Sequence, residues 1–104
     1  MGKELPDSIA EPEVEIEEEL TEPPMYRVIL HNDDYTPRDF VVQVLMAVFA
    51  KTAEAAAQLM WHVHRNGSGV CGVYTREVAE TKVETVRTLA REHGFPLQTT
   101  MEPD

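Results

Sequence analysis

Apolar residues recur along this chain with two different spacings, and the changes between them mark the elements of a small domain. A β-branched and aromatic run from Met25 to His31 predicts a first strand. Three consecutive apolar residues within it, Val28 to Leu30, indicate burial on both faces and a place well inside a sheet. Apolar residues at helical spacing then predict three helices, and two short runs predict two further strands.

The expected elements follow one another in the order β-α-α-β-α-β. This order is typical of an α+β fold, here a single domain with a three-stranded, mostly antiparallel sheet packed against three helices. After the first strand, the predicted ranges are a helix at 37–50, a helix at 53–66, a strand at 70–74, a helix at 76–93 and a strand at 97–101. Thr52 is the expected cap of the second helix, and Gly67 and Gly94 are expected to end the second and the third.

The junction between the first strand and the first helix carries the clearest local signals. Thr36 suits a helix cap, Pro37 the first helical position, and Asp39 stands three residues after the cap as in a capping box. Just before them, Asn32 and Asp33 bring an amide and a carboxylate to the corner. Such residues bond their own backbone in turns, but they also accept hydrogen bonds from ligands. Both interpretations stay open at this point.

Charge separates the first 24 residues from the rest of the chain. The formal net charge of the 104 residues is −10, of which residues 1–24 carry −8 and residues 25–104 only −2. Because a segment so acidic and so poor in apolar residues cannot bury enough surface to fold, we expect residues 1–24 to be a disordered extension and residues 25–104 to be the core domain. The sequence lacks clusters of Lys and Arg, which argues against nucleic acid or an anionic membrane surface as a partner.

The sequence also limits the chemistry that we expect. The single cysteine, Cys71, excludes an internal disulfide and a thiolate zinc site, and its apolar strand indicates a small buried side chain rather than a nucleophile. The segment from Asp33 to Pro37 lacks the alternating oxygens of a calcium loop. With no signal-peptide core and no run of membrane-spanning length, we expect a soluble cytoplasmic protein without metal, cofactor or enzymatic activity.

The class of function that remains for this chain is the recognition of a ligand. On the second predicted helix Met60, Val63 and His64 stand at i, i+3 and i+4 and share one face, whereas His62 points away from His64. Trp61 is interpreted as a filler of the core or of a groove. Together with the oxygens of the corner, the Met60 face suits a ligand that is cationic at one point and apolar beside it.

Four motifs give this chain a family resemblance. They are Asn32-Asp33-Asp34-Tyr35-Thr36-Pro37, Gln58-Leu59-Met60 with Val63-His64, Cys71-Gly72-Val73-Tyr74-Thr75, and Glu77-Val78-Ala79-Glu80-Thr81-Lys82-Val83. In this order, and over residues 23–104, the sequence resembles ClpS, the bacterial adaptor that hands N-degron substrates to the ClpAP protease. The resemblance implies the ClpS fold and a pocket for the free N-terminal residue of a substrate, when that residue is Leu, Phe, Tyr or Trp.

The resemblance also implies roles for individual residues. One set binds the α-amino group of the substrate, a second lines the pocket for its first side chain, and a third lies on the surface that docks to the N-terminal domain of the unfoldase ClpA. The acidic extension corresponds to a flexible extension that assists substrate handover, and we expect a monomer. The implied residues are Asn32, Asp33 and His64 for the amine, Thr36, Arg38, Val41, Met60, Val63 and Leu97 for the side chain, and Glu77 and Lys82 for docking.

Arg38 departs from the family pattern, which often has Met at the pocket entrance. Either its guanidinium reaches into solvent or pairs with Asp34 or Asp39, or it alters the ranking of Leu, Phe, Tyr and Trp. Two other functions compete with degron binding. One is a module that binds an internal peptide or another cation at the same corner. The other is a small hydrolase using His64 and Asp33, for which the chain offers no placed nucleophile.

Overall fold

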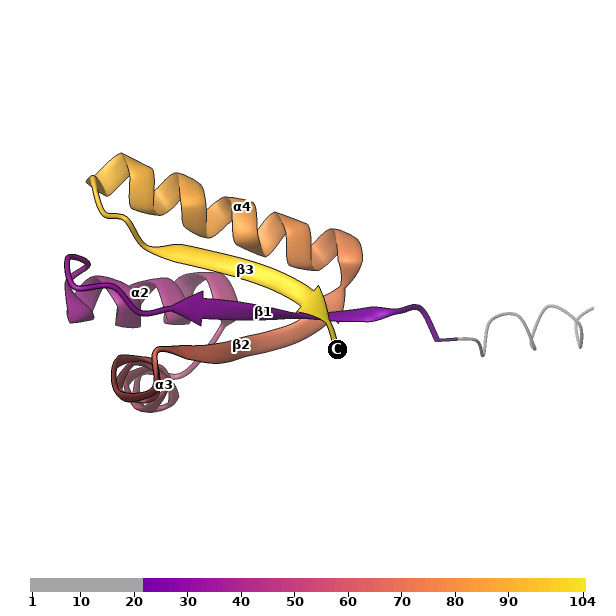
Figure 1. Ribbon diagram of the computed structural model, residues 1–104, viewed down its shortest axis with the longest axis horizontal. Helices are drawn as coiled ribbons and strands as arrows, with labels where there is room; N and C mark the ends of the chain where they lie inside the picture. Colours follow the sequence, from indigo (N-terminus) through magenta and orange to yellow (C-terminus); the bar gives the residue numbers. More distant parts are fainter. Residues whose placement is uncertain (1–21) are drawn as a thin grey trace, which may run out of the picture.

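The structure, a computed structural model, describes residues 22–104. Residues 1–21, which hold most of the predicted acidic extension, lie outside the described residues, so the division after residue 24 stays a prediction. Within residues 22–104 the elements follow the predicted order, and no helix there is both long enough and apolar enough to cross a membrane (Figure 1). The elements are β1 (Met25–His31), α2 (Arg38–Phe49), α3 (Ala53–Asn66), β2 (Ser68–Thr75), α4 (Arg76–His93) and β3 (Gln98–Pro103).

β1 is the central strand of the sheet (Figure 1). It pairs with β2 on one side and with β3 on the other, and both pairings are antiparallel. The α+β prediction is therefore confirmed, with a sheet that is antiparallel throughout the described residues. The register between β1 and β2 shifts between Val28 and Ile29, where Cys71 is the extra residue on the β2 side of a bulge.

Among residues 22–104, only one face of the sheet is covered. Val28 and Leu30 are fully buried, whereas Arg27, Ile29 and His31, which alternate with them along β1, are only partly buried. α4 packs against all three strands, and α2 and α3 pack against β2. The prediction that β1 is buried on both faces is thus wrong. β1 is central because it has a hydrogen-bonded neighbour on each side, not because a second layer covers its other face.

Local signals set the ends of the helices. The side chain of Thr52 accepts a hydrogen bond of 3.1 Å from the N–H of Ala55 and caps α3, as predicted. Gly67 (φ 94°) and Gly94 (φ 76°) end α3 and α4 in the left-handed conformation, which costs a glycine little. The predicted stops of both helices are confirmed.

Cys71 lies in the core, with only 2% of its surface exposed. Burial raises the pKa of its thiol to about 12. The thiol therefore stays protonated near neutral pH, and a protonated thiol is a poor nucleophile. The interpretation of Cys71 as a small buried side chain is confirmed.

Lys82 connects α4 to the end of α2. Its Nζ donates a hydrogen bond of 2.7 Å to the carbonyl oxygen of Val48, in the last turn of α2, where carbonyl groups lack partners within the helix. The ammonium also lies 6.0 Å from the ring centre of Phe49 and 5.5 Å from that of Tyr74. Lys82 is half-buried, so this contact fixes the C-terminal end of the helix whose other end begins at the site described below.

Replacing Lys82 by Met is expected to lower the free energy of unfolding by about 1 to 2 kcal/mol, because it removes a charge-assisted hydrogen bond and keeps the apolar stem. Urea denaturation measures this change. Arg87→Met is the matched control, since Arg87 forms an exposed ion pair with Glu84 on the same helix, and it should cost at most about 0.5 kcal/mol. Equal losses in the two variants would contradict the structural role of Lys82.

Candidate functional site

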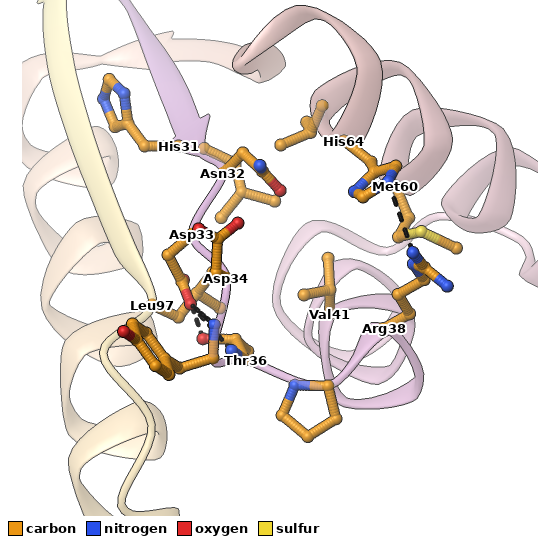
Figure 2. Close-up of a pocket in the computed structure, with 14 residues that line it drawn as sticks. His31, Asn32, Asp33, Asp34, Thr36, Arg38, Val41, Met60, His64 and Leu97 are labelled. Atoms are coloured by element: carbon orange, nitrogen blue, oxygen red, sulfur yellow. Dashed lines mark hydrogen bonds between the residues drawn. The ribbon is translucent and has the colours of Figure 1, made fainter.

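A pocket with a cavity volume of about 430 Å³ opens where β1 ends and α2 begins (Figure 2). The β1–α2 loop, the start of α2, the second half of α3 and the segment before β3 form its wall. Every residue that the sequence analysis assigned to binding a substrate lines it, namely Asn32, Asp33, Thr36, Arg38, Val41, Met60, Val63, His64 and Leu97. Residues that the sequence analysis did not assign also line it, namely Leu30, His31, Asp34, Tyr35 and Pro37.

The inner part of the pocket is apolar. Val41, Met60, Val63 and Leu97 are between 3% and 8% exposed. α3 supplies Met60 and Val63 one turn apart and places the exposed His64 beside them. The predicted shared face of these three α3 residues is confirmed. A ligand that enters the pocket therefore meets polar groups first and buried apolar side chains behind them.

Gly69 allows α3 to pack close to the start of β2. A Cβ atom at this position would lie 2.9 Å from Cγ2 of Val63 and 3.0 Å from Cδ1 of Leu59. Contacts this short are strongly repulsive, so any larger residue would push Val63, and with it the pocket wall, away from the sheet.

The carboxylate of Asp33 organises the β1–α2 loop (Figure 2). Its Oδ1 accepts hydrogen bonds from the N–H groups of Tyr35 (2.8 Å) and Thr36 (2.7 Å), and its Oδ2 accepts one from the hydroxyl of Thr36 (2.8 Å). A carboxylate has about four acceptor positions, so one position on Oδ2 remains for a further donor. The structural and the functional interpretations of Asp33 are therefore compatible.

The predicted capping box at the start of α2 is wrong. α2 begins at Arg38, and its N-cap residue is Pro37, which makes no side-chain cap. The helix starts one residue later than this motif requires, and the hydroxyl of Thr36 donates to Oδ2 of Asp33. Asp39 accepts a hydrogen bond of 2.8 Å from the N–H of Phe40.

Asn32 stands at the mouth of the pocket. Its main-chain N–H donates to the carbonyl oxygen of Gly67 at 2.9 Å, which joins the end of β1 to the turn after α3. Its exposed side-chain amide faces His64 across the opening (Figure 2). The ring of His31 turns away from the pocket and lies 2.7 Å from the hydroxyl of Thr100. Of the two histidines along the pocket, His64 is therefore the one whose ring meets a ligand.

Arg38 reaches across to α3 and not to the neighbouring acids. Its Nη2 lies 3.3 Å from Nε2 of His64, and its guanidinium carbon lies 4.8 Å from the ring centre of Trp61 (Figure 2). The predicted pairing with Asp34 or Asp39 is therefore wrong, whereas Arg38 does remain exposed to solvent. Trp61 is 39% exposed, so of its two interpretations, a filler of the core or of a groove, the core is wrong. One signal for it was present in the sequence, because Trp61 precedes His64 by three residues and shares its helix face.

The two residues assigned to docking lie outside the pocket, on α4. Glu77 is exposed in the first turn of this helix. Lys82 is half-buried, and its ammonium is bonded to Val48 as described above. The structure therefore keeps the predicted docking residues apart from the pocket.

Comparison with known proteins decides the family. Residues 21–100 match the family model of "ATP-dependent Clp protease adaptor protein ClpS". The chain belongs to the ClpS family. It is 63% identical over 82 residues to the ClpS adapter protein of Desulforapulum autotrophicum, covering 79% of each chain. It is 56% identical over 91 residues to the ClpS of Lawsonia intracellularis, covering 88% of this chain and 84% of that one.

A solved structure agrees with this membership. Agrobacterium tumefaciens ClpS2, bound to L-phenylalaninamide, superposes with a TM-score of 0.78 and 47% identity, over 80% of this chain and all of that one. The predicted family and its fold are therefore confirmed, and the family is one of adaptors of the Clp protease. The roles of single residues in the pocket stay predictions.

Asp33→Ala is expected to lower the free energy of unfolding by about 1 to 3 kcal/mol, because the loop loses the acceptor of three hydrogen bonds. Chemical denaturation at neutral pH measures the change. Asp34→Ala replaces the exposed neighbouring acid and should stay within about 0.5 kcal/mol. If Asp33→Ala costs no more than Asp34→Ala, other contacts hold the loop.

Proposed function

We propose that this chain binds the free N-terminal residue of proteins that begin with Leu, Phe, Tyr or Trp and delivers them to the ClpAP protease. The observation that carries the proposal is the pocket, in which an amide, a carboxylate and an imidazole stand at the entrance of an apolar cavity. The similar ClpS2 structure is bound to L-phenylalaninamide, a molecule with a free α-amine and a phenyl side chain.

The polar groups at the entrance match the donors of an α-amine. A protonated α-amine has three N–H donors, and Asn32, Asp33 and His64 offer an amide oxygen, a carboxylate oxygen and an imidazole nitrogen as acceptors. An internal residue of a protein has no such amine. It would leave these acceptors without partners in a closed site, and this loss is the basis of discrimination.

The buried side chains of the pocket match the first side chain of the substrate. Val41, Met60, Val63 and Leu97, with the methyl group of Thr36 near the entrance, would surround a large apolar group. Burial of such a group contributes about 1.5 to 3 kcal/mol. The two contacts together select a large apolar residue that also carries a free amine.

Delivery needs a second surface, and we assign it to α4. Glu77 and Lys82 would contact the N-terminal domain of the unfoldase ClpA. Because the ammonium of Lys82 is bonded to Val48, Glu77 would be the more accessible of the two charges. We further propose that the protein acts as a cytoplasmic monomer, and as an adaptor rather than an enzyme. The buried thiol of Cys71 supports a role other than catalysis, since a buried, protonated thiol is a poor nucleophile.

A Phe-first peptide with a free N-terminus is expected to bind about 10 to 150 times more tightly than its acetylated form. Acetylation removes the charge and two of the donors, at a cost of about 1.5 to 3 kcal/mol. Fluorescence anisotropy with labelled peptides measures the ratio. Equal affinities would instead support the alternative function, a module that binds an internal peptide at the same corner.

The same assay compares two histidines of α3. His64→Ala should weaken the free-amine peptide markedly, whereas His62→Ala should bind it like the unchanged protein. His62 is the matched control because its ring contacts Asn66 on the same helix and does not line the pocket.

Deletion of residues 2–20 should leave peptide affinity within about twofold, because the pocket is built from residues 30–97. It should slow the degradation of an N-degron substrate by ClpAP, because we assign the extension to handover. A Gly-Ser segment of equal length separates the effect of length from that of composition. If binding and degradation both stay unchanged after the deletion, the extension has no part in delivery.

A further inference from the structure

Arg38 occupies the acceptor that the proposed function reserves for the substrate. Its Nη2 lies 3.3 Å from Nε2 of His64, at the mouth of the pocket that both residues line. A guanidinium group has only donors, so Nε2 must be the unprotonated nitrogen and must accept.

A neutral imidazole has a single nitrogen lone pair. With the Nε2 lone pair directed to Arg38, Nδ1 carries the proton and can only donate. In this state His64 cannot accept a hydrogen bond from an α-ammonium. The substrate amine and the guanidinium of Arg38 are therefore alternative partners of His64, and binding of the amine through His64 requires the release of Arg38.

The released guanidinium stays near the mouth. Trp61 holds it by a cation–π contact, with the guanidinium carbon 4.8 Å from the ring centre, and this contact does not depend on the lone pair of His64. Consecutive Cα atoms are about 3.8 Å apart, so a substrate whose amine contacts His64 brings its second residue within reach of the long side chain of Arg38. The second residue thus meets an arginine that has just lost its acceptor.

We propose, on the basis of the proposed function, that Arg38 is a specificity-determining residue. It must release His64 to admit the α-amine, and it then selects an acidic side chain at the second position of the substrate. A carboxylate there accepts the guanidinium donors that His64 gave up. A lysine or arginine there is repelled by the guanidinium of Arg38. The protein would therefore recognise two consecutive residues, the first through the apolar cavity and the second through its charge.

Arg65 provides a matched control. Its guanidinium carbon also faces the ring of Trp61, at 5.7 Å, but Arg65 does not line the pocket. Substituting it removes one positive charge near the same indole and leaves the contact between Arg38 and His64 in place. An effect of overall charge would thus appear when either arginine is replaced. An effect of the exchange of Arg38 for the amine at His64 would appear only when Arg38 is replaced.

The test measures the affinities of two free-amine peptides that differ only at the second residue, Phe-Asp and Phe-Asn, for the full chain and for Arg38→Met and Arg65→Met. Met keeps an unbranched stem at position 38 and removes the donors. In the unchanged protein and in Arg65→Met, the Phe-Asp peptide should bind about two- to fivefold more tightly, as expected for an exposed ion pair, and less so at high salt. In Arg38→Met this preference should vanish, and the Phe-Asn peptide should bind about two- to fivefold more tightly than to the unchanged protein, since no guanidinium competes for His64.

The proposal is overturned if the unchanged protein does not prefer Asp to Asn, if Arg38→Met keeps the preference, or if Arg38→Met weakens the Phe-Asn peptide. The ¹⁵N signals of the His64 ring without any peptide give an independent measure. They should report an accepting Nε2 in the unchanged protein and a different balance of tautomers in Arg38→Met, and identical signals would also overturn it. Acetylated peptides that bind as well as free ones would refute the proposed function instead, whatever the ring signals show.

Discussion

The pocket of this protein depends on how the chain passes from β1 to α2. The strand ends at His31 and the helix begins at Arg38, and the carboxylate of Asp33 closes the few residues between them with three hydrogen bonds. The first residue of this loop and the first residue of α2 lie on opposite sides of the pocket mouth, with Asn32 on one side and Arg38 on the other. The hydrogen bonds of a single carboxylate thus help to set the width of the pocket mouth.

Much of the fold was predictable because its signals are local. The cap at Thr52, the glycines after α3 and α4 and the spacing of apolar residues act within a few positions of the chain, and each prediction based on them agrees with the structure. The errors arose where two groups compete or where distant segments meet. Thr36 had the features of a cap, but Pro37 is the N-cap residue of α2, and Thr36 belongs to the loop that Asp33 holds together. Three consecutive apolar residues in β1 suggested that both faces of the strand are covered. Which face is buried depends on where the helices pack, and they come from later segments of the chain.

Predictions about the candidate site succeeded or failed for similar reasons. The family resemblance identified residues that do line one pocket, although they come from segments as far apart as Asn32 and Leu97. The partner of Arg38 was not predictable, because His64 is 26 positions away and no local pattern links an arginine to a histidine at that distance. Nor did the sequence distinguish a charge on the surface from one built into the fold, as with Lys82. The family resemblance therefore located the site, and contacts between helices determine which groups of each residue remain available for further hydrogen bonds.

The burial of Cys71 has a practical consequence for chemical labelling. It is the only cysteine of the chain, and its thiol is both enclosed in the core and protonated near neutral pH. Maleimides and related reagents attack exposed thiolates, so the folded protein behaves toward them as though it had no cysteine. A cysteine introduced at an exposed position such as Gln43 then becomes a unique attachment point for a fluorophore or spin label. The natural cysteine can stay in place, which avoids opening a cavity beneath the sheet.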